Sequence, residues 1–304
     1  MKRLKDIHLT MENRESIAGY LFTLPFILGF IFMVLYPFIQ SIIFSLSKLE
    51  ITGNGYELFF VRLENYYKAL FVNADFPRIL VETLLKMLRF VPLVLIFSFF
   101  AAILLNQEFK GRLLARVIFF LPVILGAEIV LRIEMADYMT LVQEMDTAVD
   151  YGLTNMLSMS TLSDFLLQLK LPQGLLLYII QGVEKVTEVI RASGIQILIF
   201  LAGLQSIPKS LYEAADVEGA TGWENFWMIT LPLLSPLILT NIVYTIVDFF
   251  ISPSNPMIDF IQTNAFGGAG YGVSMAMSWI YFLVVGVILF ITIGIISKNV
   301  FYME

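Results

Sequence analysis

Two residue types that carry much of protein chemistry are almost missing from this chain: it has no cysteine and one histidine, His8. Without cysteine it can form no disulfide bond, no thiolate metal site and no cysteine nucleophile. His8 lies in the polar N-terminal tail, so histidine acid–base chemistry and histidine metal clusters are removed from the rest of the chain. We therefore expect no catalytic residue and no metal site.

Charged residues are also scarce. They make up 14% of the 304 residues, whereas 58% are hydrophobic. Soluble domains carry about 25% charged residues, so this composition is typical of a membrane protein. The net charge of -6 says little, because the side of the membrane on which each loop lies matters more than the sum.

The motifs of nucleotide hydrolysis and of common hydrolases are absent. There is no G-x-x-x-x-G-K-[ST] phosphate loop, and neither G-x-S-x-G nor H-E-x-x-H occurs. The glycine-rich run from Gly267 to Gly272 lacks the lysine of a phosphate loop and is interpreted as a flexible loop. We expect a protein that is not an enzyme and does not hydrolyse ATP itself.

What the chain does have is long apolar segments, and they predict an all-α membrane protein with six transmembrane helices. Residues 1–16 form a polar tail that resembles the start of a signal peptide, but the apolar stretch after it is too long for one, so it is interpreted as an uncleaved anchor. Residues 299–304 form the other tail, and 17–298 form the transmembrane domain. The predicted spans are about 17–47, 79–105, 113–131, 174–205, 227–250 and 273–297.

The loops between these spans fix the predicted orientation. Six spans place both termini on one side, and the positive-inside rule puts that side in the cytoplasm. The outer loops are then about 48–78, 132–173 and 252–272, and a polar loop at about 206–226 is cytoplasmic. Nine basic residues lie inside: Lys2, Arg3, Lys5, Arg14, Lys110, Arg112, Arg116, Lys209 and Lys298. Six lie in the longer outer loops: Lys48, Arg62, Lys68, Arg78, Arg132 and Lys170.

The cytoplasmic loop between predicted spans four and five contains a short helix. Pro208 suits its first turn, but Ser210 with Glu213 also has the spacing of a capping box, so the helix could start at either. Gly219 is expected to end it. The aromatic residues from Trp223 to Trp227 favour a membrane interface before the next span begins.

The same loop carries a resemblance to a known family. Glu213-Ala214-Ala215, three residues, Gly219, nine residues and then Ile229-Thr-Leu-Pro232 resemble the EAA loop of binding-protein-dependent ABC importer permeases. The preceding Phe200-Leu-Ala-Gly-Leu-Gln-Ser-Ile-Pro208 and the following Leu231-Pro-Leu-Leu234 are similar to the carbohydrate-uptake, maltose-type branch. The resemblance is strong over about 195–240 and weaker across 17–131. An ordinary amphipathic connector is the alternative.

The resemblance implies a fold, a role and several partners. It implies a permease subunit in a bacterial or archaeal plasma membrane, forming a sugar pathway by alternating access with a second, non-identical permease subunit. A separate ABC ATPase dimer would bind ATP and Mg, and an extracytoplasmic binding protein would deliver the solute. Membrane lipid is the remaining partner, and nucleic acid is not expected. The residues implied in ATPase coupling are Glu213, Ala214, Ala215, Asp216 and Gly219.

Charged residues also lie within the predicted spans. Glu82, Lys86 and Arg89 have i, i+4, i+7 spacing and so share one face of the second span, as Glu184, Glu188 and Arg191 do on the fourth. Along a straight helix, Arg191 would lie about 21 Å from the cytoplasmic end at Gln205. Because an ionised group facing lipid is costly, we expect Lys86, Arg89, Glu188 and Arg191 to line a solute path. The alternative is internal ion pairs, Glu82–Lys86 and Glu188–Arg191.

The fifth span adds a polar face made of Asn241, Tyr244 and Asp248. These residues are also predicted to line the path, with interhelical hydrogen bonding as the alternative. The solute is expected to be a sugar or oligosaccharide, and the basic residues would also suit an acidic sugar or a glycerol phosphate. An ion-coupled secondary transporter is the competing function, because intramembrane carboxylates can be ion sites, although it leaves the EAA loop unexplained.

Overall fold

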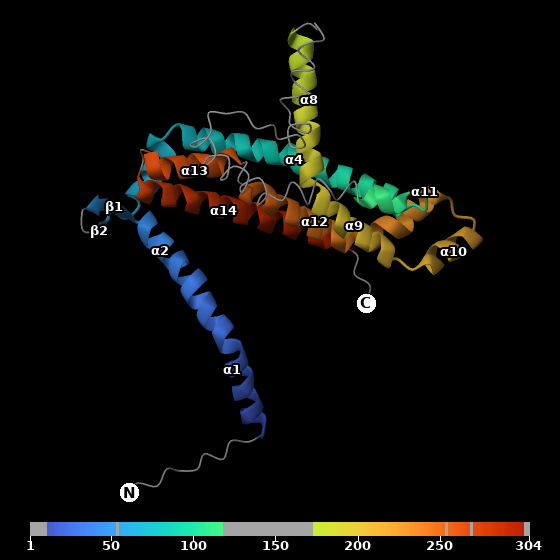
Figure 1. The fold of residues 1–304 in the computed structure, drawn as a ribbon, viewed down its shortest axis with the longest axis horizontal. Helices are drawn as coiled ribbons and strands as arrows, with labels where there is room; N and C mark the ends of the chain where they lie inside the picture. The colour runs from blue at the N-terminus through green and yellow to red at the C-terminus, as the bar shows by residue number, and fades with distance from the viewer. Residues whose placement is uncertain (1–10, 53–54, 118–172, 253–254, 268–269, 301–304) are drawn as a thin grey trace, which may run out of the picture. The chain divides into compact units, whose positions relative to one another are not determined.

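The computed structural model describes residues 11–52, 55–117, 173–252, 255–267 and 270–300, which are almost entirely helical. The chain divides into two compact units. The first contains residues 1–83 and 253–286, and the second contains 84–252 and 287–304. Figure 1 shows the order of the elements along the chain.

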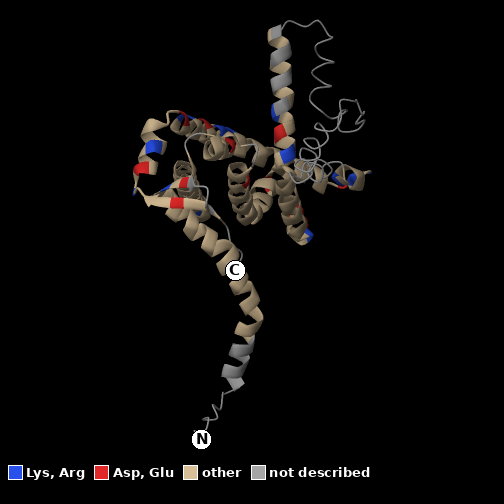
Figure 2. Cartoon of the chain, turned by 60° about the vertical axis from the view of Figure 1, so that its left-hand side comes forward, with Lys and Arg blue, Asp and Glu red and all other residues tan. Residues whose placement is uncertain are grey.

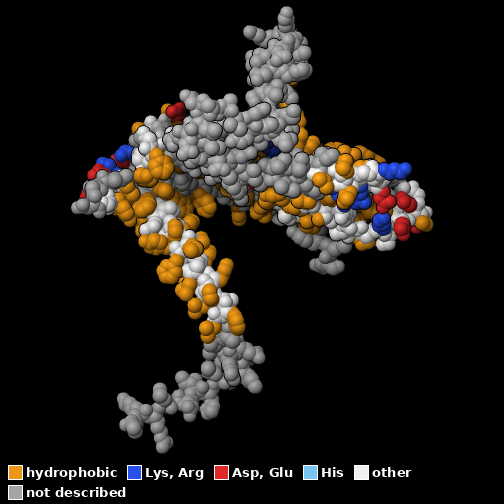
Figure 3. Space-filling model, viewed as in Figure 1, with side chains coloured by type: hydrophobic (Ala, Val, Ile, Leu, Met, Phe, Trp, Pro, Cys, Tyr) orange, Lys and Arg blue, Asp and Glu red, His pale blue; other side chains and the backbone are white. Residues whose placement is uncertain are grey.

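The first unit begins with a long apolar helical segment. It consists of α1 (Met11–Phe30), a π-helical turn (Ile31–Leu35) and α2 (Tyr36–Ser45). Most of its described apolar side chains are exposed, as Phe22 at 88% shows, and Figure 3 shows hydrophobic side chains covering α2. Such a surface suits contact with lipid rather than with water.

The loop predicted at 48–78 is largely structured. It contains an antiparallel hairpin of β1 (Ser47–Thr52) and β2 (Gly55–Phe60), in which Leu49 pairs with Leu58. A short helix α3 (Glu64–Tyr67) and a second π-helical turn (Lys68–Val72) follow. These elements were not predicted from the sequence, because the two strands are short and contain no long apolar run.

The segment predicted as an outer loop at 252–272 contains a helix, α13 (Pro256–Gly267). Pro256 opens the helix, where its missing N–H costs nothing, and the side-chain oxygen of Asn255 accepts a hydrogen bond from the Met257 N–H at 3.0 Å. The proline and asparagine that suggested a loop are therefore a helix start. The helix α14 (Tyr271–Ile296) follows it.

The second unit contains the helices that carry the predicted site: most of α4 (Asp75–Asn106), α8 (Gln173–Ala192), α9 (Gly194–Ser206), α10 (Lys209–Val217), α11 (Gly222–Asn225) and α12 (Leu231–Ile251). Its core lies where α4, α9 and α12 meet. Ala102, Phe200 and Leu234 are almost completely buried there. Gly203 lets α9 approach α12 so closely that a Cβ atom would meet the side chains of Leu234, at 2.7 Å, and Leu237.

Prolines explain two irregular turns. The turn Ile31–Leu35 ends two residues before Pro37. A third π-helical turn, Phe226–Thr230, ends two residues before Pro232. A proline cannot donate to the carbonyl four residues earlier and its ring clashes with it, so the backbone widens there to i→i−5 hydrogen bonds. The spans continue through these prolines instead of ending at them.

The predicted fourth span is not one straight helix. It bends by 50° between Lys185–Ala192 and Gly194–Ser206. At the bend, the N–H and the Oγ of Ser193 both donate to the Ile190 carbonyl, at 3.3 Å and 2.8 Å, which closes α8 with a tighter turn. The height of Arg191 measured along a straight helix is therefore wrong.

Four helical segments of the described chain are long and apolar enough to cross a membrane: Gly19–Ser45, Asp75–Asn106, Gly222–Gly267 and Tyr271–Ile296. The bent pair makes a fifth if it is one span. The predicted third span at 113–131 and outer loop at 132–173 lie almost entirely outside the described residues, of which only 112–117 is described as helical at this point. The count of six spans and the side of each terminus stay predictions.

Candidate functional site

The EAA loop forms a short helix with two well-defined ends. After α9 the backbone is extended at Ile207 and Pro208, and α10 begins at Lys209. At the other end the Ala220 N–H donates to the Ala215 carbonyl at 2.9 Å and the Gly219 N–H to the Asp216 carbonyl at 3.1 Å. This is a Schellman motif, and it requires the positive φ of +85° that Gly219 adopts. The predicted stop at Gly219 is confirmed.

The predicted capping box of Ser210 and Glu213 is wrong. The residue at the N-cap is Pro208, and it makes no side-chain hydrogen bond to the helix. Ser210 therefore lies inside the first turn, two residues past the N-cap position. A capping box is present instead at the next helix, α11, where the Thr221 Oγ1 accepts from the Glu224 N–H at 3.4 Å and the Thr221 N–H donates to the Glu224 carboxylate at 2.7 Å.

One face of α10 is tied to the segment that leads into α12. The hydroxyls of Tyr212 and Thr230 are 2.9 Å apart and hydrogen-bonded, and the Asn225 amide donates to the Asp216 carboxylate at 3.0 Å. Thr230 in turn donates to the Asn225 carbonyl at 3.3 Å. These bonds link α10 to the segment that leads into α12.

The other face of α10 is free for a partner. Glu213, Ala214 and Glu218 are exposed, and Val217 is 86% exposed, so this face presents both carboxylates and apolar surface. Figure 3 shows acidic and basic side chains gathered near α10 beside a hydrophobic surface. The structure thus divides the predicted coupling residues: Asp216 points into the hydrogen-bonded face, whereas Glu213 and Ala214 lie on the exposed one.

Next to this helix, three aromatic rings are stacked together. Trp223 and Phe226 have centroids 6.2 Å apart in a stacked arrangement, and Trp227 meets both edge-on. Trp223 remains 70% exposed. Aromatic residues of this kind are enriched where a span meets the headgroup region, so their place just before α12 suits the entry of that helix into a membrane.

The charged residues of the predicted path pair across helices rather than along them. The Lys86 ammonium on α4 lies 2.8 Å from the Glu188 carboxylate on α8, with both side chains nearly half exposed. The pairs Glu82–Lys86 and Glu188–Arg191, which were the alternative to a solute path, are therefore not the ones that the described structure shows. Sequence separation misled the prediction, because the two partners are 102 residues apart. Figure 2 shows how few charges the helices of the described chain carry.

Each partner of this ion pair is followed, about one turn later on its own helix, by an arginine: Arg89 on α4 and Arg191 on α8. Both are exposed, and neither makes a salt bridge within the described part of the chain. Two guanidinium groups within membrane spans need water, a lipid headgroup or an anionic ligand to be stable. The side chain of Glu184, which shares the predicted face of α8, lies outside the described side chains.

Asn241, in contrast, is completely buried between α9 and α12. Its amide donates to the Gln196 carbonyl at 3.4 Å, and the Gln196 amide donates to the Thr245 hydroxyl at 3.1 Å. This is the interhelical hydrogen bonding that was the alternative to a solute contact. Tyr244 and Asp248 are half-buried on the same helix.

Sequence reasoning did not single out Gln196, Thr245, Ser98 or Ser193, all of which are almost fully buried. The Ser98 hydroxyl, on α4, contacts the Ser193 carbonyl at 3.4 Å, at the bend between α8 and α9. Gln196 could have been found, because it is the first strongly polar side chain in the apolar run from Gly194 to Gly203. A polar residue in such a run must find a partner inside the bundle.

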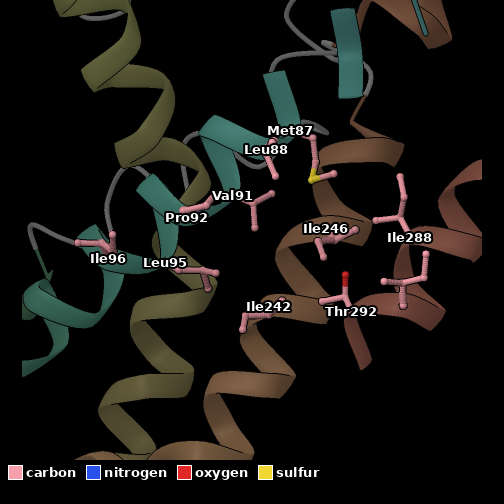
Figure 4. A pocket seen from close by; sticks show the side chains of 11 residues that line it. Met87, Leu88, Val91, Pro92, Leu95, Ile96, Ile242, Ile246, Ile288 and Thr292 are labelled. Carbon is pink, nitrogen blue, oxygen red and sulfur yellow. The ribbon is translucent and has the colours of Figure 1, made fainter. Parts of the chain in front are cut away.

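A cavity of about 520 Å³ lies within the second unit (Figure 4). Its lining comes from three helices and is apolar except for Thr292, so it does not suit a hydrophilic solute. The lining residues are Met87, Leu88, Val91, Pro92, Leu95, Ile96, Ile242, Ile246, Ile288, Ile291 and Thr292. No group of three His, Cys, Asp or Glu side chains that could hold a metal ion occurs among the described residues.

Known proteins similar to this chain are transport permeases. No family model matches the chain. It is 28% identical to the probable ABC transporter permease protein YesP of Bacillus subtilis, over 99% of this chain and 96% of that protein. It is 32% identical to the arabinooligosaccharides transport system permease protein AraP of the same species, over 78% of this chain and 70% of that protein.

Solved structures agree at the level of the fold. A bacterial ABC transporter that imports the acidic polysaccharide alginate matches with a TM-score of 0.60 and 18% identity, over 94% of this chain and 97% of that one. A structure of the bacterial alginate ABC transporter with its alginate pentasaccharide-bound periplasmic protein also matches with a TM-score of 0.60, at 19% identity over 92% of this chain and 94% of that one.

Proposed function

Because this chain belongs to the carbohydrate-uptake family of binding-protein-dependent ABC importer permeases, we propose that it forms half of the membrane pathway of a sugar importer. A second, non-identical permease subunit would form the other half. An ABC ATPase dimer would bind ATP and Mg on the cytoplasmic side. An extracytoplasmic binding protein would deliver the solute, as the periplasmic protein bound to the alginate transporter suggests.

The proposed contact with the ATPase is the exposed face of α10. The observation that carries this proposal is that α10 is anchored: it ends in a Schellman motif, and Tyr212 and Asp216 are hydrogen-bonded to the segment that leads into α12. An anchored helix transmits a push instead of absorbing it. Glu213, Ala214 and Val217 would contact the ATPase, while Asp216, Ala215 and Gly219 would hold the helix in shape.

The push would reach the solute path through two helices that move together. Gln196 on α9 bonds to Thr245 on α12, and Asn241 on α12 bonds to the Gln196 carbonyl. We propose that these bonds make α9 and α12 one rocking unit, which alternately opens the path inward and outward. The 50° bend at Ser193 is where this unit would move against α8.

The proposed solute is a sugar or oligosaccharide. Arg89 and Arg191 would line its path, the Lys86–Glu188 pair would border it, and Tyr244 and Asp248 would add hydrogen-bonding groups on α12. Asn241 would act on α12 through Gln196 and not on the solute. Two guanidinium groups without an acidic partner within the described chain also favour a solute that carries carboxylates.

The coupling proposal can be tested in the natural cysteine-free background. In Ala214→Cys the new thiol should form a disulfide with a cysteine placed in the cleft of the co-expressed ATPase, and a membrane-impermeant maleimide should not label it in intact cells. Tyr56→Cys, at an exposed position of the hairpin, is the matched control and should be labelled from outside without forming that crosslink. Labelling of Ala214→Cys from outside, or no crosslink to any ATPase, would refute the proposal.

A further inference from the structure

Two arginines meet at one backbone carbonyl where α4 ends. The chain turns through 107–111, with Gly111 at a φ of +95°, and is helical again over 112–117. The Arg112 Nε donates to the Leu105 carbonyl at 3.2 Å and the Arg116 Nη2 donates to the same oxygen at 3.4 Å. Leu105 lies in the last turn of α4, where carbonyls have no partner within the helix. The shared carbonyl fixes both guanidinium groups side by side.

This arginine pair has positive charge and donors to spare. Each guanidinium carries five N–H groups, and the Leu105 carbonyl takes one from each. The Arg116 Nε is buried and has no hydrogen-bond acceptor within the described chain. The nearby carboxylate, Glu108, lies 3.3 Å from the Lys209 ammonium instead. Two fixed cations are therefore left without an anion among the described residues.

The surroundings indicate which kind of anion would fit. Three apolar side chains next to the arginines in the sequence are exposed: Leu113 at 78%, Leu114 at 67% and Val117 at 57%. In a membrane protein, apolar side chains this exposed contact acyl chains. The apolar span α4 ends at Asn106 and the arginine pair follows it shortly afterwards in the chain, where the headgroup region is expected.

We propose that Arg112 and Arg116 bind the phosphate of an anionic phospholipid, whose acyl chains lie along Leu113, Leu114 and Val117. The planar guanidinium matches the oxygens of a phosphate with paired hydrogen bonds, and the adjacent apolar side chains favour a lipid over free phosphate. Assignment to the cytoplasmic leaflet rests on the orientation proposed above; the binding itself does not. Since Glu108 pairs with Lys209, the first residue of α10, the bound headgroup would adjoin the coupling helix.

The test is a lipid titration of the full chain, purified with its partner subunits and followed by native mass spectrometry. Phosphatidylglycerol should form a one-to-one adduct, and phosphatidylcholine with the same acyl chains should bind at least tenfold more weakly. Arg112→Gln and Arg116→Gln should each weaken the phosphatidylglycerol adduct about tenfold, as expected for loss of a charge-assisted hydrogen bond. Inorganic phosphate at millimolar concentration should not displace the lipid.

Lys110→Gln is the matched control. It removes the same charge from an exposed side chain that makes no hydrogen bond or ion pair within the described residues, and it should weaken binding less than threefold. Arg112→Lys with Arg116→Lys keeps the charge and loses the planar geometry, so binding should fall while the thermal stability without lipid stays close to that of the parent. Equal binding of the two lipids, displacement by phosphate, or an equal loss in Lys110→Gln would each overturn the proposal.

Discussion

At the scale of single residues, the first unit depends on a glycine in α14. A Cβ atom at Gly272 would lie 2.8 Å from the Asn65 amide and even closer to the Ser47 carbonyl oxygen. The Asn65 amide is itself buried and donates to the carbonyls of Ser45 and Ser47, each at 2.9 Å. The helix, the asparagine and the start of the hairpin therefore occupy one crowded point.

We expect Gly272→Ala to destabilise the protein by about 1–3 kcal/mol, because the atom it meets is backbone and cannot move aside cheaply. The thermal unfolding midpoint in detergent measures this effect. Gly286→Ala on the same helix is the control: nothing lies within 4 Å of its Cβ position, so alanine should be neutral or slightly stabilising. Equal midpoints for the two variants would show that the close approach at Gly272 is not formed.

Buried polar residues matter at this scale in a second way. Gln196, Asn241 and Thr245 bond to one another in a region where water is excluded, so each depends on the other two. Asn241 illustrates the difficulty of interpreting a polar residue within a span. The same side chain suits a solute path and a helix interface, and only its complete burial places it at the interface.

At the scale of the elements, the ion pair between Lys86 and Glu188 is the charged link that joins α4 to α8 in the described structure. Both side chains are nearly half exposed, so the pair contributes modestly in water, about 0.2–1 kcal/mol. Removing one partner leaves the other charge alone within a span, which costs more than the pair contributes.

A double-mutant cycle tests this link. Lys86→Met and Glu188→Gln should each lower the unfolding midpoint more than the variant that carries both substitutions. The charge-swapped variant, Lys86→Glu with Glu188→Lys, should have a midpoint above those of the single variants. The same cycle between Arg89→Gln and Glu188→Gln should give a coupling near zero, because no salt bridge joins these two side chains. Strictly additive effects of Lys86→Met and Glu188→Gln would argue against the pair.

At the scale of the whole molecule, the fold is that of an importer subunit, and the question is which solute it transports. If Arg89 and Arg191 line the path, the importer should prefer a solute with carboxylate or phosphate groups. Uronate-containing oligosaccharides should then compete better than neutral ones for the partner binding protein. ATP-driven uptake of an acidic sugar should fall about tenfold in Arg89→Gln, while uptake of a neutral one should change little.

Two outcomes would count against this prediction. Better competition by neutral sugars would assign the two arginines to headgroups or to the second subunit. Uptake that persists in ATP-depleted vesicles under an ion gradient would favour the secondary transporter that the intramembrane carboxylates left open. In that case the exposed face of α10 would need another partner.

Much of this arrangement was predictable from local patterns. The apolar runs predicted the long helices, because hydropathy is a property of each segment alone. The EAA spacing and Gly219 predicted where α10 ends, because a Schellman motif needs only a few consecutive residues and a positive φ. The strands and helices within 48–78 and 252–272 were not predicted, because proline, asparagine and glycine mark helix starts and tight turns as readily as irregular loops.

By itself, the sequence determined that this is a membrane permease without cysteine chemistry, with a capped helix between two of its spans. Only the tertiary structure decided that Lys86 pairs with Glu188 and not with Glu82, that Asn241 is buried, that the fourth span bends at Ser193, and that two arginines share the Leu105 carbonyl. Each of these depends on which surfaces meet, and partners 102 residues apart in the chain leave no mark in its local periodicity.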